Sequence, residues 1–91
     1  MLFVSFLTPS HGTREERVSR RLQWQYPEDV NLVAEIWLQS DDPAVIVIFE
    51  TENSLTLEKV RAYWGDVFSI TTIPAITGEE GLELAKKMMG S

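Results

Sequence analysis

The chain has 91 residues, of which 44% are hydrophobic and 24% charged, so it fits one globular domain over residues 1–91 and excludes extended disorder. It has no cysteine, which excludes disulfides and thiolate metal sites and makes the cytoplasm the expected location for so small a domain. Its net charge of −6 disfavours nucleic acid and anionic membranes as partners.

The N-terminal segment, residues 2–8, is apolar on both of its alternating faces. We expect it to form a central strand rather than a signal peptide or a membrane span. After a short loop, Thr13 and Glu16 have the spacing of a capping box, which predicts a helix over residues 14–25. We expect Val18 and Leu22 to form its buried stripe and Trp24 to lie off that stripe.

Residues 30–39 alternate between an apolar and a mixed set, which is typical of an edge strand. Residues 40–43 favour a hairpin turn. The run from 43 to 52 contains six consecutive apolar residues, Ala44 to Phe49, and predicts a strand buried on both faces.

A second helix is expected from a cap at Asn53 or Ser54 to Trp64, with Leu57 and Val60 facing the core. Residues 67–75 favour a fourth strand, which Pro74 restricts to an edge. Thr77 begins another capping box, so a third helix should follow, with Leu82, Ala85 and Met89 on one stripe and with fraying at 90–91.

The order strand, helix, strand, strand, helix, strand, helix predicts an α+β fold of the ferredoxin-like βαββαβ type with an added C-terminal helix. Its four-stranded antiparallel sheet should have the order 4-1-3-2, which places the two most apolar strands in the centre.

The first two helices can cover only one face of such a sheet. The other face would expose several hundred Å² of apolar surface, which is more than a soluble monomer usually tolerates. We therefore expect a homodimer that packs sheet against sheet as a dimeric α+β barrel. The alternatives are that the third helix covers this face within one chain or crosses the rim of the dimer. A charge introduced at Val47 or Ile48, whichever faces the partner, should then disrupt the dimer.

Three short runs carry a resemblance to a known family. They are Glu35-Ile36-Trp37, Ile48-Phe49-Glu50-Thr51 and the segment from Tyr63 to Ile76, with its spacing of Trp64, Asp66 and Pro74. The chain resembles domain-of-unknown-function family 3303 over nearly its whole length. The resemblance implies a small prokaryotic protein of the dimeric α+β barrel class and implies no activity. Similar sequences often have a basic residue where this chain has Ile36.

The candidate ligand-binding residues are Glu35, Trp37, Glu50 and Trp64. Glu35 and Trp37 share a face of one strand, and a carboxylate pair with an indole would form near the barrel mouth if Glu50 lay on the same face. A carboxylate there would have a raised pKa and could act as an acid or a base. The alternative places both glutamates in water and Trp37 at a dimer rim, with Trp64 in the core.

His11, the single histidine, and Glu50 are the candidate catalytic residues, although a solvated loop position accounts for His11 more simply. We expect no metal site and no cofactor, because the possible ligands are scattered. Arg14, Arg17 and Arg21 share a helix face that could receive a phosphate or an acidic partner. Neighbouring acidic residues could instead pair with them.

Three functions remain open from the sequence. The first is a homodimeric module that binds a small apolar or aromatic molecule. The second is a cofactor-independent enzyme of the monooxygenase or isomerase type, which rests on fold analogy alone. The third is a protein-interaction module that uses the arginine face of the first helix.

Overall fold

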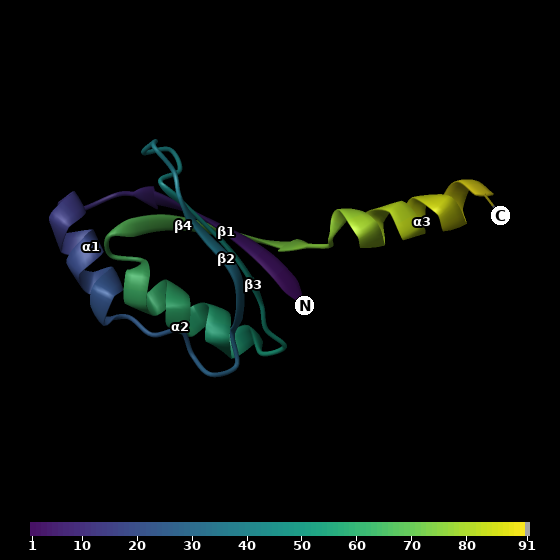
Figure 1. Ribbon diagram of the computed structural model, residues 1–91. Helices are drawn as coiled ribbons and strands as arrows, with labels where there is room; N and C mark the ends of the chain where they lie inside the picture. Colours follow the sequence, from purple (N-terminus) through teal and green to yellow (C-terminus); the bar gives the residue numbers. More distant parts are fainter. Residues whose placement is uncertain (91) are drawn as a thin grey trace.

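The computed structural model describes residues 1–90, and Ser91 lies outside them. Figure 1 shows a sheet with two helices on one side and a third helix that extends away from it. The elements in chain order are β1 (Leu2–Pro9), α1 (Arg14–Gln23), β2 (Asn31–Trp37), β3 (Val45–Glu50), α2 (Ser54–Trp64), β4 (Phe68–Ala75) and α3 (Gly78–Gly90).

The sheet has four strands in the order β2-β3-β1-β4, and every neighbouring pair is antiparallel. This is the predicted order 4-1-3-2 read from the other edge, so the ferredoxin-like layout is confirmed. The most apolar strands, β1 and β3, lie in the centre, and β4 with its Pro74 lies at an edge, where a missing backbone donor costs least.

Strand alternation decides which side chains meet the helices. Val47 lies opposite Ser5 in β1 and opposite Glu35 in β2, so these residues share a face. That face contributes to the buried core, which consists of Leu7, Val47, Phe49 and Phe68 of the strands together with Trp64 of α2 and Val67. Leu57 and Val60 of α2 pack against this core, as the spacing predicted, and the side chain of Asn53 caps the helix.

Helix α1 begins with the predicted capping box, in which Thr13 and Glu16 satisfy each other's backbone donors. The helix ends at Gln23, two residues earlier than expected. The predicted stripe is wrong at Leu22, whose side chain is 82% exposed. Trp24 packs against the core in its place because the chain leaves the helix there in an extended conformation.

Strand β2 ends at Trp37 and not at the expected residue 39. Its pairing with β3 shifts between Leu32 and Ala34, where the strand carries a bulge. The irregularity lies at an edge of the sheet, where bulges are common. It keeps Glu35 and Trp37 on the helix-covered face.

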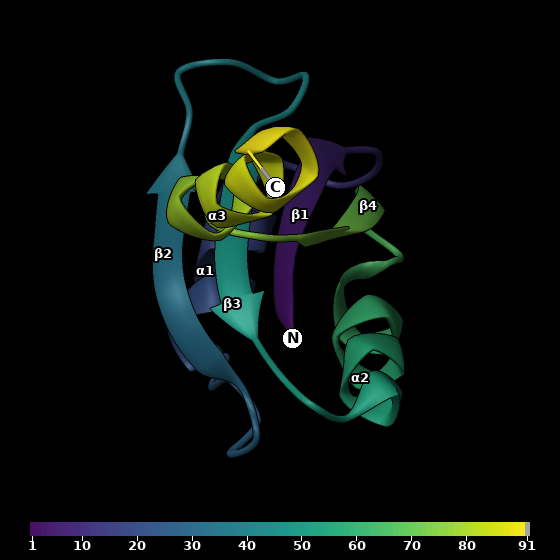
Figure 2. The same ribbon diagram turned by 90° about the vertical axis from the view of Figure 1, so that its right-hand side faces the viewer.

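Helix α3 does not cover the second face of the sheet. It runs away from the sheet in Figure 1, and Figure 2 looks along its axis from the C-terminal end. The chain measures 53 × 28 × 17 Å and has a radius of gyration of 15.4 Å, against about 12 Å for a compact domain of this length. The even-numbered residues of β1 and β3, including Phe6, Ile46 and Ile48, therefore remain partly exposed. The sequence predicted that β1 and β3 are buried on both faces. This prediction is wrong within one chain, where the helices cover only one face of these strands.

Candidate functional site

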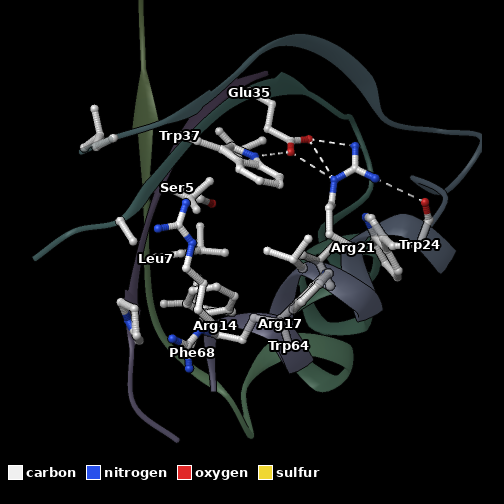
Figure 3. Close-up of a pocket in the computed structure, with 18 of the residues that line it drawn as sticks. Ser5, Leu7, Arg14, Arg17, Arg21, Trp24, Glu35, Trp37, Trp64 and Phe68 are labelled. Carbon is white, nitrogen blue, oxygen red and sulfur yellow. Dashed lines mark hydrogen bonds and ion pairs between the residues drawn. The ribbon is translucent and has the colours of Figure 1, made fainter. Parts of the chain in front are cut away.

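A cavity of about 400 Å³ lies between the covered face of the sheet and the first two helices. Figure 3 shows side chains of both layers around it, with Trp37 and Glu35 on the sheet side and Arg14, Arg17 and Arg21 from α1. The volume is in the range of small-molecule sites. Its aromatic lining consists of Trp24, Tyr26, Trp37, Phe49, Trp64 and Phe68.

The alternation of side chains along the central strands determines which residues form the floor of this cavity. Ser5, Leu7, Val45 and Val47 alternate with residues of the other face, so the two central strands direct a mainly apolar row toward the helices. The buried hydroxyl of Ser5 is within hydrogen-bond distance of the hydroxyl of Thr72, at 2.8 Å. The floor is therefore apolar, and this polar side chain on it already has a partner.

Glu35 is the centre of a hydrogen-bond network at the wall of the cavity (Figure 3). Arg21 donates to both carboxylate oxygens, with Nε 2.9 Å from Oε2 and Nη2 2.9 Å from Oε1. Tyr26 donates from its hydroxyl to Oε1 at 2.7 Å, and Trp37 donates from Nε1 to Oε2 at 2.7 Å. This carboxylate thus fixes the positions of an arginine, a tyrosine and a tryptophan that all line the cavity.

The network keeps Glu35 ionised. Burial raises the pKa of Glu35, but the hydrogen bonds from Arg21, Trp37 and Tyr26 outweigh burial and hold that pKa below its usual range. Burial, followed by the bond to the carboxylate, raises the pKa of the Tyr26 hydroxyl. The raised carboxylate pKa considered from the sequence is therefore absent at Glu35, and the group is a charged anchor.

Aromatic rings form the second wall. The Trp24 ring lies 4.4 Å from that of Tyr63 and meets Trp64 edge to face at 6.1 Å. Arg20 secures this wall from outside by donating to the Tyr63 carbonyl and to both carboxylate oxygens of Asp66. Asp66 thus joins the turn after α2 to α1.

Two further guanidinium groups line the cavity from α1. Arg17 donates to the backbone carbonyls of His11 and Gly12, each at 2.9 Å, and lies over the Phe68 ring. Arg14 has no hydrogen-bond or ion-pair partner within residues 1–90. The arginine face noticed in the sequence is therefore directed at the cavity, where Arg21 is paired with Glu35 and Arg14 is free.

The predicted site residues divide into two groups. Glu35, Trp37 and Trp64 line one cavity, although Trp64 is also only 6% exposed and packs in the core. Glu50 lies opposite Leu2 on the other face of the sheet and is exposed, so the carboxylate pair does not form. His11 lies exposed in the loop before α1, outside the cavity lining, with Nδ1 3.3 Å from the Ser10 hydroxyl.

The sequence reasoning missed Trp24 and Tyr26 as site residues. Both follow the end of α1, and the helical spacing used to place Trp24 no longer applies in an extended segment. Their signal was present in the aromatic pair before Pro27, because a proline restricts the preceding residue to extended geometry.

Within the part of the chain described by the structure, no cluster of three or more histidine or carboxylate side chains could hold a metal ion. Among the same residues, no helix is both long enough and apolar enough to cross a membrane.

The fold and the site define an α+β domain of ferredoxin-like layout with a cavity between sheet and helices. The chain belongs to the family described as a domain of unknown function (DUF3303), whose profile matches residues 1–89. The family resemblance is thereby confirmed. No curated protein and no solved structure matches the chain.

Proposed function

We propose that this protein is a homodimeric module that binds a small aromatic or apolar molecule in the cavity between sheet and helices. The observation that carries the proposal is the cavity itself, which combines an apolar floor with aromatic walls and a few fixed polar groups. Such a combination is typical of ligand sites. Trp37 is 48% exposed at this site and offers an indole face to an incoming ring.

Residue Val18 offers a direct test, because it lines the cavity from α1 and is only partly buried. In Val18→Phe the added ring should occupy the cavity and weaken binding of 2-naphthamide, a neutral two-ring aromatic, by at least tenfold. Isothermal titration calorimetry measures the dissociation constant.

The matched control is Ser19→Phe, which adds the same ring to the exposed side of the same helix. It should bind 2-naphthamide as the wild type does. If Val18→Phe binds 2-naphthamide as well as the wild type does, the cavity is not the site.

The dimer is supported by the second face of the sheet, which none of the helices within residues 1–90 covers (Figure 1). Leu2, Val4, Phe6, Ile46 and Ile48 lie on this face and alternate with the buried row. A two-fold dimer that packs these faces together would bury the row and form the α+β barrel expected from the sequence.

The interaction-module alternative loses its main support. Arg17 and Arg21 are engaged with backbone carbonyls and with Glu35, so they do not present a free basic surface. The enzyme alternative would need a group for proton transfer at the cavity, and its candidates from the sequence, His11 and Glu50, do not line it.

A further inference from the structure

The charges at the cavity indicate the class of ligand. Three arginines line it, and the acidic residues among the lining are Glu35 and Asp41. Glu35 is neutralised by its bidentate pair with Arg21. Arg14 and Arg17 therefore face one exposed carboxylate, Asp41, and the site has a surplus of positive charge in a chain whose net charge is −6.

Arg14 is the group with unused bonding capacity. It stands in the first turn of α1, where the helix dipole disfavours a cation, and none of the described carboxylates, including Glu15 and Glu16 in the same turn, forms an ion pair with it. A guanidinium group presents paired donors in a plane that matches a carboxylate. Arg17 is held in place by two carbonyls and adds a second fixed positive charge.

We propose that the cavity binds a small aromatic carboxylate, with its ring against Trp37 and the apolar floor and its carboxylate on Arg14. This inference rests on the proposed function, because it specifies the ligand of the same site. Arg17 contributes long-range attraction and the aromatic walls supply the contact area.

The test compares 2-naphthoate with 2-naphthamide, which share the ring system and differ in charge. The wild type should bind the anion about tenfold more tightly, as expected for one charge-assisted contact. In Arg14→Gln this preference should disappear, so that the two compounds bind with about equal affinity. Arg61→Gln removes an exposed arginine of α2 that does not line the cavity, and it should keep the preference.

The outcomes separate the two claims. If the wild type binds both compounds equally, or if Arg14→Gln keeps the full preference, the anion inference is overturned and the cavity remains a ligand site. If neither compound binds, both the anion inference and the proposed function fail. A preference that shrinks as salt rises would support a direct contribution from charge.

A second, independent observation concerns α3. Its large apolar side chains are at least half exposed, with Leu82 at 65%, Met88 at 84% and Met89 at 86%. The chain exposes 6477 Å², about 1,100 Å² more than the ~5,400 Å² expected for a compact protein of its mass. That excess is comparable to the roughly 800 Å² that each partner buries in a stable interface.

We infer that α3 is an exchanged arm that packs against the sheet of a second copy of this chain at the rim of the sheet-to-sheet dimer, beside the apolar row that the two sheets bury together. Within its own chain α3 points away from the uncovered face of the sheet (Figures 1 and 2), while the face itself presents apolar side chains that lack a cover. A second copy supplies the missing partner for both surfaces at once, since the exchange is reciprocal.

Because the chain has no cysteine, a single spin label can be placed at Met89→Cys in the full-length protein. Mixing this unenriched protein with ¹⁵N-enriched wild type reports contacts between chains alone. Amide signals of β1 and β3 should broaden, and those of α1, on the other side of the sheet, should keep their intensity.

Sedimentation of the same sample separates the possible failures. A dimer without broadening between chains overturns the exchanged arm and leaves the sheet-to-sheet dimer in place. Broadening confined to α1 also overturns it. A monomer overturns both the exchanged arm and the sheet-to-sheet dimer.

Discussion

Glu35 connects three parts of the chain through its two carboxylate oxygens. Arg21 comes from α1, Tyr26 from the segment after it, and Trp37 from the same edge strand. Only 13% of the Glu35 side chain is exposed, so its hydrogen bonds are not replaced easily by water. This residue therefore fixes the wall of the cavity as well as stabilising the fold.

Glu35→Gln should lower the free energy of unfolding by about 1–3 kcal/mol, because Arg21 loses its charged partner in a partly buried position. Urea unfolding followed by tryptophan fluorescence measures the change. The control is Glu58→Gln, an exposed position of α2, which should stay within about 0.5 kcal/mol of the wild type. Equal stability of both variants would show that the Glu35 network contributes nothing.

The same carboxylate predicts a pH dependence. Its pKa in the folded protein is lowered below the value of about 4.3 expected in the unfolded chain, so its contribution is present above that pH and is lost as the pH falls through the folded pKa. Hydrogen bonds from Thr56 and Arg20 also lower the pKa values of Asp29 and Asp66, respectively. Protonation of these two carboxylates in acid therefore destabilises the fold as well.

The part of this acid sensitivity that Glu35 causes is therefore measured by comparing the wild type with Glu35→Gln. From pH 6 to pH 3 the wild type should lose more stability than Glu35→Gln, and the two should converge at the acidic end. Urea midpoints at each pH measure this difference. A constant gap between the two curves would mean that the pKa of Glu35 is not lowered by folding.

Individual site residues were predictable where they lie inside regular strands. Glu35 and Trp37 were placed on one face by alternation alone, and the structure joins them by a hydrogen bond. Glu50 could not be placed, because the face it occupies depends on the register between β3 and its neighbours, which residue types do not specify. Pro27 marks the extended geometry of Tyr26, but the hydrogen bond that brings Tyr26 to the cavity wall is a tertiary contact with Glu35, which no local pattern specifies.

At the scale of elements, the capping box of α1 gives the clearest link from sequence to stability. The Thr13 hydroxyl accepts from the Glu16 backbone N–H at 3.1 Å. Thr13→Ala should therefore lower the free energy of unfolding by about 1 kcal/mol. Urea unfolding checks this value, with Ser19→Ala in the exposed middle of the helix as the control. A loss in Ser19→Ala as large as in Thr13→Ala would argue against the cap.

Element types and order were predictable because hydrophobic periodicity and caps are local signals. The ends of α1 and β2 were less predictable. Helix α1 stops where Trp24 turns into the core, and β2 is interrupted by a bulge beside Val33, and both depend on packing. The placement of α3 was left open by the sequence, since an amphipathic helix packs equally well on its own chain or on another.

At the scale of the molecule, the uncovered sheet face predicts association. Val47 is buried against the helices, whereas Ile48 lies on the uncovered face, so the structure decides which of the two should face a partner. Ile48→Asp should convert a dimer into a monomer, because an unpaired charge would be buried at the interface. Analytical ultracentrifugation measures the mass in solution.

Ser19→Asp is a suitable comparison for Ile48→Asp, because it places the same charge at an exposed position of α1, on the other side of the sheet (Figure 1). It should shift the dimer equilibrium much less. A folded dimer from Ile48→Asp, shown by an unchanged circular dichroism spectrum, would contradict the sheet-to-sheet arrangement.

The claim that the cavity is a ligand site is tested most directly by the indole N–H signals of the protein. All three tryptophans, Trp24, Trp37 and Trp64, line the cavity, so a ¹H–¹⁵N spectrum titrated with 2-naphthoate observes it from three positions. The account predicts that the indole signals shift together with one dissociation constant while the amide of Ile48 on the other face stays in place. Stationary indoles with a shifting Ile48 amide would contradict it and would locate binding on the uncovered face of the sheet.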